Sequence, residues 1–347
     1  GDAITVEVKY MAQVPGMNLS PLYVDAADLA RPLMITLLGE SSTIANQTDL
    51  FTQQDGSKVD VLFVVDNTAS MVEEQPRLVA AIPSFVSAAQ QKGVDLHVAV
   101  TTTGIDFASA SCPGGANGGE AGRFFPANGS STRILTSNTP NLSSALQTNV
   151  QVGRCAFVEQ GFEATRRALT APLVNHADDQ RTSLPNDGNL GFLRSEAALA
   201  VVYVSDEDDH SPDDVDTYAQ FLRTVKGQYQ PQRATAFAIA PTAGGCSTAG
   251  GAGTRYSQMV QKTGGDVMSV CNSDYAPLLQ QVANKAFSPQ SKFTLSHKPD
   301  SGTIKVTVNG TELTSGWSYD AGSNSVIFST MPAAGARIQI AYRRSCS

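Results

Sequence analysis

VDVLFVVDNTASMVEE, residues 59–74, is the stretch of this chain that decides its fold. Its first half is almost unbroken apolar sequence, the pattern of a parallel strand that is buried on both faces. The sequence then changes abruptly to Asp66, Thr68 and Ser70, three oxygen donors at alternate positions, before a helix begins. Ligands bind at the carboxyl ends of such strands, and one carboxylate with two hydroxyls suits Mg²⁺ or Mn²⁺. The stretch therefore predicts an α/β sheet with a small metal site at its edge.

The segment DNTASM, residues 66–71, resembles the metal-ion-dependent adhesion site of the von Willebrand factor A family, whose pattern D-x-[ST]-x-S follows the first strand. A second apolar run, AALAVVYV at residues 197–204, also ends in acid, in the sequence SDEDD. The resemblance maps the family's other essential carboxylate onto Asp206. It covers about two thirds of the chain. It implies a doubly wound, mostly parallel, Rossmann-like sheet with the site at the end of its first strand.

Both strand ends have a purely structural alternative. An acid or a serine after a buried strand often caps the following helix, so Asp66 and Ser70 are also candidate N-caps. On the same alternative, the acidic stretch 206–214 is a solvated loop with a helix cap at Ser211. The two motifs together favour the metal site, with Asp66 and the two hydroxyls as direct ligands and Asp206 binding directly or through water.

One ligand of the family's site has no counterpart of the same type. The family supplies a further threonine from a loop just before a helix, and the corresponding stretch here is QVGRCAFVEQGFEATRRAL, residues 151–169. No threonine precedes the helix, and Glu159 is the expected substitute. A third carboxylate would hold the metal more tightly and make it less electrophilic toward a partner's carboxylate. The alternative is that Glu159 only stabilises the start of the helix.

Composition and charge exclude several classes of function. Of the 347 residues 41% are hydrophobic and 16% charged, which describes a folded protein with ample core. A net charge of −8 without a basic stripe argues against a nucleic-acid partner. No apolar segment approaches the roughly 18 residues that span a bilayer, so any envelope anchor is expected outside this chain. The sequence holds no HExxH, G-x-S-x-G, Walker or Rossmann fingerprint, so we do not expect an enzyme.

Five cysteines indicate an oxidising compartment, and none is spaced as a CxxC zinc site. We pair Cys246 with Cys271, because each follows one of two neighbouring predicted strands. A bridge between Cys112 and Cys155 would tie a glycine-rich loop to the segment near the metal site. Cys346 is then left as a free thiol.

The chain divides into three parts. Alternating strands and helices over residues 58–288 predict a parallel sheet that is covered on both faces, with a glycine- and serine-rich loop insertion at 104–151. Short alternating segments over 289–347 predict an all-β sandwich. Residues 1–57 contain too few strands for a core of their own, so we expect them to complete this sandwich; two separate flanking modules are the alternative. Helices are predicted at 76–91, 157–169, 213–226, 256–262 and 275–286, strands of the flanking segments at 4–10, 33–38, 292–296, 303–309, 316–319, 324–329 and 337–342, and a short strand in the insertion at 133–136.

We interpret the chain as an exported, metal-dependent binding or adhesion protein of the bacterial envelope type, whether secreted, periplasmic or on the cell surface. In the family, the open coordination position of the metal accepts a carboxylate, so the expected partner is a protein with an exposed acidic residue. Mg²⁺ is the expected ion, and Mn²⁺ or Ca²⁺ are alternatives. Two other functions stay open: an envelope scaffold that the metal stabilises, and a metal-assisted hydrolase in which the ion activates water.

Overall fold

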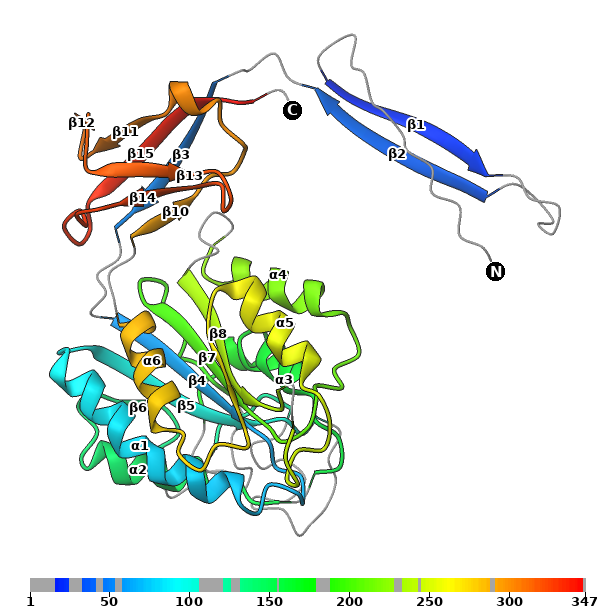
Figure 1. Cartoon of the computed structure of the whole chain (residues 1–347), viewed down its shortest axis with the longest axis vertical. Coiled ribbons are helices and arrows are strands. Elements are labelled where there is room, and N and C mark those ends of the chain that lie inside the picture. Colours follow the sequence, from blue (N-terminus) through cyan, green and yellow to red (C-terminus); the bar gives the residue numbers. More distant parts are fainter. Residues whose placement is uncertain are drawn as a thin grey trace.

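The computed structural model describes residues 16–24, 33–41, 46–53, 58–105, 121–125, 132–154, 156–178, 188–227, 233–242, 245–287 and 291–345. Figure 1 shows an α/β domain, a smaller β-sandwich and a two-stranded hairpin. Among the described residues, no helix combines the length and the apolar character that crossing a membrane requires.

The α/β domain is built on a six-stranded sheet with the order β6-β5-β4-β7-β8-β9. Its strands run parallel except at one edge, where the short β6 is antiparallel to β5. Every residue of β4 after the first is buried, as its apolar sequence predicts. The fold is therefore mixed α/β with a mostly parallel sheet. The strands are β4 (Lys58–Val65), β5 (Asp95–Thr102), β6 (Leu135–Thr136), β7 (Ala198–Val204), β8 (Ala234–Ala240) and β9 (Val267–Ser269).

Helices cover both faces of this sheet and form two separate cores. The side chains of β4 alternate between these cores, with Phe63 in one and Leu62 in the other. Helices α1, α2 and α6 lie on the first face and α3, α4 and α5 on the second (Figure 1). The helices are α1 (Glu74–Gln91), α2 (Leu142–Asn149), α3 (Gly161–Ala168), α4 (Val215–Val225), α5 (Thr254–Thr263) and α6 (Ala276–Ala286), with short 3-10 turns at Leu173–Asn175 and Ser301–Thr303.

Two helices differ from the sequence prediction. The helix expected from residue 157 begins only at Gly161, because the preceding residues form a loop that is tied to the sheet by the Gln160 N–H, which donates to the Thr103 carbonyl at 2.9 Å. The insertion was expected to contain one short strand, and it also contains α2. Leu142 and Leu146 of that helix are buried in the first core, although the surrounding sequence is rich in residues typical of loops.

The β-sandwich consists of a three-stranded sheet, β10-β14-β13, and a four-stranded sheet, β12-β11-β15-β3. Phe51, Phe293 and Phe328 lie in its core, and the ring centroids of the first two are 5.2 Å apart. Trp317 packs against this core. The strands are β3 (Asn46–Thr52), β10 (Lys292–Thr294), β11 (Lys305–Val308), β12 (Thr311–Leu313), β13 (Trp317–Asp320), β14 (Ser325–Phe328) and β15 (Arg337–Arg343).

Strand β3 is the piece of the N-terminal segment that joins the sandwich. It pairs antiparallel with β15 along its whole length. The buried carboxylate of Asp49 fastens it, because it accepts hydrogen bonds from the Ser296 hydroxyl at 2.6 Å and the Tyr342 hydroxyl at 2.8 Å. The strands β1 (Gly16–Val24) and β2 (Leu33–Ser41) pair with each other in a separate hairpin. The strand predicted at residues 4–10 lies outside the described residues.

Candidate metal centre

The candidate metal centre lies at the carboxyl edge of the central strands β4 and β7. These strands are parallel neighbours whose last residues, Val65 and Val204, are directly paired. The Asp66 N–H donates to the Val204 carbonyl at 2.8 Å and so ties the two strand ends together. Strand register therefore brings Asp66 and Asp206 to the same edge, although they are far apart in the sequence.

Close polar contacts join the four main predicted ligands in one continuous series. The hydroxyl and the backbone N–H of Thr68 both donate to Asp66 Oδ1 at 2.7 Å. The Thr68 and Ser70 hydroxyl oxygens are 3.0 Å apart. Ser70 Oγ in turn donates to Asp206 Oδ1 at 3.0 Å. The cluster thus contains two carboxylates and two hydroxyls, the oxygen donors that a hard divalent cation prefers.

Neither carboxylate in this cluster forms an ion pair with any of the residues that the structure describes. Asp66 is fully buried, and this burial raises its pKa, while hydrogen bonds from Ser205 and Thr68 oppose the rise. Burial, followed by the negative charge of Asp66, raises the pKa of Asp206 to about 7. Ionising two buried carboxyls whose hydrogen-bond donors are neutral costs free energy, and a bound cation would offset this cost. The residues present therefore fit a divalent metal.

Glu159 lies in the loop before α3, beside the loop that carries Thr68. The two loops are joined by the Ala156 N–H, which donates to the Asn67 carbonyl at 2.9 Å. Burial, and then the negative charge of Asp66, raises the pKa of Glu159 to about 7. Its Oε2 atom is 3.2 Å from His210 Nδ1. The described part of the chain contains no group of three His, Cys, Asp or Glu side chains placed to hold a metal, so ligation by Glu159 stays a prediction.

The alternative roles as helix caps do not fit the observed contacts. Glu73 at the N-cap of α1 makes no capping hydrogen bond with its side chain, and Asp66 and Ser70 bond within the oxygen cluster instead. Helix α4 is capped by Asp214, whose carboxylate accepts the N–H three residues further on at 2.7 Å. The alternative in which Ser211 caps the following helix is therefore wrong.

The acidic stretch after β7 is built into the fold, which the sequence did not reveal. Asp209 Oδ2 accepts the Phe162 N–H at 3.0 Å at the start of α3. Asp208 Oδ1 accepts the Arg255 N–H at 3.0 Å at the start of α5. Each acid thus stabilises the N-terminus of a helix 47 residues away. A capping pattern is recognisable in a sequence only when cap and helix are adjacent, so no local signal marks these two roles.

Two further residues that the sequence analysis missed hold Asp66 in place. Ser205 Oγ donates to Asp66 Oδ2 at 2.7 Å, so both carboxylate oxygens have a partner. Gln75 of α1 donates its side-chain amide to the Asp66 carbonyl oxygen at 3.0 Å. Ser205 could have been recognised, because it directly precedes Asp206 at a strand end that is equivalent to the end of β4. Gln75 carries no such signal.

The disulfide Cys246–Cys271 lies at the same edge and confirms the predicted pairing. It joins the loops that follow β8 and β9. Within the first of these loops, the Gly250 N–H donates to the Asp206 carbonyl at 2.7 Å, so the bridged loop supports the metal-site loop. The cysteines at positions 112, 155 and 346 lie outside the described residues.

No protein-family model and no curated protein sequence matches the chain. Among solved structures, proximal thread matrix protein 1 from the mussel byssus is similar, with 12% identity and a TM-score of 0.41 over 71% of this chain and 51% of that chain. The pilus adhesin SpaC from Lactobacillus rhamnosus GG is similar with 11% identity and a TM-score of 0.38 over 95% of this chain and 43% of that chain. The chain thus spans about half the length of these proteins. Likeness of this extent assigns no function, so a proposal has to come from the residues of the candidate metal centre.

Proposed function

We propose that the chain is an exported, non-catalytic binding protein with a von Willebrand factor A type domain. Asp66, Thr68, Ser70 and Asp206 bind a divalent cation, Mg²⁺ in the first place, and the bound cation captures an acidic group of a partner protein. Glu159 is the candidate for an additional ligand. The secreted, periplasmic or cell-surface location is part of the same proposal, and the disulfide Cys246–Cys271 supports it.

The observation that carries this proposal is a pair of buried carboxyls that have no cationic partner among the residues that the structure describes. Asp66 and Asp206 are 0% and 1% exposed, and each accepts hydrogen bonds from neutral hydroxyl or N–H groups. A buried acid of this kind lowers the stability of the protein unless it is paired or coordinates a metal. Such an arrangement is common at functional sites, where stability is exchanged for a binding group.

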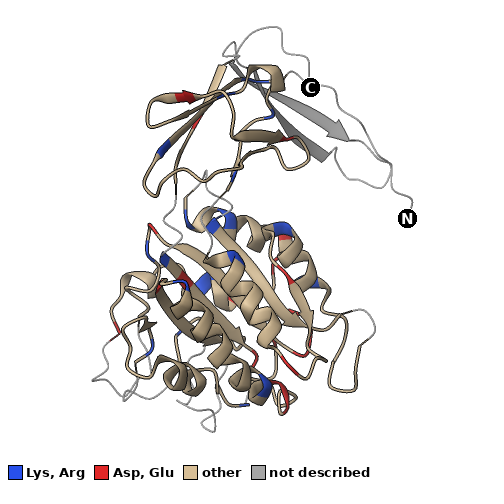
Figure 2. Ribbon diagram, turned by 60° about the vertical axis from the view of Figure 1, so that its left-hand side comes forward, with Lys and Arg blue, Asp and Glu red and all other residues tan. Residues whose placement is uncertain are grey.

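The position of the cluster suits a partner that approaches from solvent. Figure 1 shows the sandwich on the side of the amino end of β4, and the cluster follows the carboxyl end of this strand. Figure 2 shows acidic residues on loops at this end of the domain, away from the sandwich. A divalent cation placed there offers a coordination position to a carboxylate, and the attraction is strong where water is partly excluded.

Calorimetric titration with Mg²⁺ and Mn²⁺ tests the metal site. The wild-type chain should bind one equivalent, and Asp66→Ala or Asp206→Ala should abolish binding while circular dichroism shows a folded protein. Asp216→Ala is the matched control, because that side chain is 79% exposed and pairs with Lys262 on the surface. Equal affinity in wild type and Asp66→Ala would refute the assignment.

Capture of a carboxylate is tested separately with a defined probe. The Mg²⁺-loaded chain should bind the blocked peptide acetyl-Gly-Asp-Gly-amide and should not bind its asparagine counterpart, as followed by chemical-shift titration. A chelator should remove the binding. If Mg²⁺ binds and stabilises the protein but the aspartate peptide does not bind, the metal is a structural one and the scaffold function replaces the proposed one.

A further inference from the structure

Three exposed apolar side chains lie on the two loops that build the metal centre. Among the described residues, seven large apolar side chains are exposed, and Phe157 at 87% is the most exposed of them. Val158 at 46% and Val72 at 53% belong to the same set. We call Phe157, Val158 and Val72 the apolar rim. Exposing a phenylalanine so fully is unfavourable unless another surface covers it.

The local geometry places the rim beside the oxygen cluster. Phe157 and Val158 immediately precede Glu159, and their loop is held against the Asp66–Ser70 loop by the parallel bridge between Ala156 and Thr68. Val72 follows the cluster directly, because the Val72 N–H donates back to the Ser70 carbonyl at 2.7 Å in a tight turn. The rim therefore comes from both sides of the site, once from the loop before α3 and once from the loop before α1.

We propose that the partner of this chain presents a carboxylate next to an apolar side chain on an exposed protein segment. This inference rests on the proposed metal-dependent capture of an acidic group. The cation receives the carboxylate, and the apolar rim covers the neighbouring side chain. The rim supplies specificity, since a cation alone does not distinguish one exposed acid from another.

Charge supports this choice of partner over a purely acidic one. Two ligand carboxylates already neutralise a divalent cation, and Glu159, whose Oε2 atom is 3.2 Å from His210 Nδ1, adds a third acidic side chain nearby. A second acid on the partner would be repelled by this edge, whereas an apolar neighbour meets Phe157 without such a cost. Burial of part of an exposed apolar side chain is worth on the order of one to two kcal/mol, which corresponds to about five- to thirtyfold in affinity.

The test compares two blocked peptides on the Mg²⁺-loaded full chain by chemical-shift titration. Acetyl-Leu-Asp-Leu-amide should bind at least about fivefold more tightly than acetyl-Gly-Asp-Gly-amide. Phe157→Ser and Val158→Ser should each reduce this preference while the affinity for Mg²⁺, measured by calorimetry, stays unchanged. Leu190→Ser is the matched control: it is 53% exposed, but the next residue contacts His97 near the start of β5, at the opposite edge of the sheet.

The outcomes separate the two proposals. Absence of Mg²⁺ binding overturns the proposed function. Normal Mg²⁺ binding with equal affinity for the two peptides overturns the role of the apolar rim alone. The role is also overturned if Phe157→Ser retains the full preference, or if the leucine peptide binds equally well in the presence of a chelator.

Discussion

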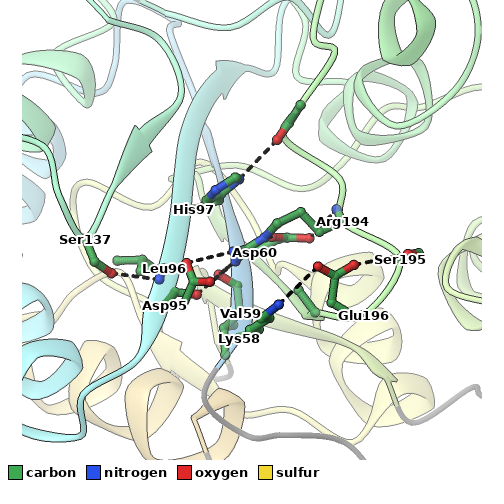
Figure 3. A network of polar contacts seen from close by, with 12 residues as sticks. Lys58, Val59, Asp60, Asp95, Leu96, His97, Ser137, Arg194, Ser195 and Glu196 are labelled. Carbon is green, nitrogen blue, oxygen red and sulfur yellow. Dashed lines mark hydrogen bonds and ion pairs between the residues drawn. The ribbon is translucent and has the colours of Figure 1, made fainter.

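A buried aspartate lies near each end of strand β4, and the two differ in the charge of their hydrogen-bond partners. Asp60, near the amino end, accepts hydrogen bonds from Arg194 Nε and from Lys226 Nζ, both at 2.8 Å. Figure 3 shows Asp60 and Arg194 within a network that extends to Asp95 on the neighbouring strand. Asp66, just past the carboxyl end, is equally buried, yet its partners among the described residues are neutral donors.

The difference indicates a structural role for Asp60 and supports the proposed binding role of Asp66. At the amino edge the negative charge is compensated within the protein, and the network ties β4, β5 and the end of α4 together. At the carboxyl edge no such compensation is found among the described residues, and the proposed cation would supply it. Burial of an acid is therefore no indication of function by itself. The proposal for Asp66 depends on its lack of a cationic partner among the described residues together with its contacts to the other oxygen ligands.

The largest expected effect is at the compensated end. Asp60→Ala removes the Asp60 carboxylate from the side chains of Arg194 and Lys226, which are 14% and 1% exposed. Breaking a buried ion pair in this way should lower the free energy of unfolding by about 3–5 kcal/mol. Urea unfolding measures it, with Asp216→Ala as the surface control. A loss below about 1 kcal/mol, the range of exposed pairs, would contradict the view that this network stabilises the fold.

A disulfide links two loops at the carboxyl edge of the sheet, whereas ion pairs between side chains stabilise the amino edge. Replacing both Cys246 and Cys271 by serine removes a bridge with a sequence separation of 25 and should lower the free energy of unfolding by about 2–4 kcal/mol. It should also weaken Mg²⁺ binding, because the bridged loop contacts Asp206 through Gly250. Unchanged stability in thermal unfolding, with unchanged Mg²⁺ affinity, would show that this edge is rigid without the bridge.

A third buried aspartate, Asp49 in the sandwich, extends the comparison. Its carboxylate has no cationic partner among the described residues either, but it accepts four hydrogen bonds, including one from the Ser296 backbone N–H at 2.8 Å. Asp49→Ala should cost about 1–3 kcal/mol, because it leaves donors such as the Tyr342 hydroxyl unsatisfied. Glu312→Ala, at an exposed position of the same sheet, is the control. If Asp49→Ala instead stabilises the chain, Asp49 would be, like Asp66, a buried acid that lowers the stability of the protein.

The stability of the metal-free protein should depend on pH at the carboxyl edge. Asp206 and Glu159 have their pKa values raised to about 7, so the folded state holds more protons than the unfolded state between about pH 4 and about pH 7. The free energy of unfolding should therefore fall as the pH rises through this window. Mg²⁺ should restore it most strongly near neutral pH, because metal and protons compete for the same oxygens.

Thermal unfolding at a series of pH values, in a chelator and in excess Mg²⁺, checks this dependence. In the variant with both Asp206→Asn and Glu159→Gln, the fall in the free energy of unfolding with rising pH should be clearly smaller than in the wild type. A decline of the same size in that variant would mean that other groups cause it.

Structural features were predicted correctly where the residues that produce them are neighbours in the sequence. The apolar run of β4 and the motif at Asp66 are continuous in the sequence, and both the strand and the grouping of the four main site residues followed from them. The supporting contacts did not, because Asp208 and Asp209 act on helices 47 residues away. The ion pairs of Asp60 could not be predicted either, because its partner Lys226 is 166 residues away in the sequence. In the sequence, Asp60 is only a single polar residue within an apolar strand.

Unfolding of wild type and Asp66→Asn, each in chelator and in excess Mg²⁺, tests the central claim most directly. If the charge of Asp66 is compensated only by a bound cation, Asp66→Asn should be at least as stable as wild type in chelator. The reason is that the substitution removes a buried charge. Mg²⁺ should then stabilise the wild type and leave the variant unchanged. A variant that is strongly destabilised in chelator, together with a wild type that does not respond to Mg²⁺, would show that Asp66 is a structural residue like Asp60.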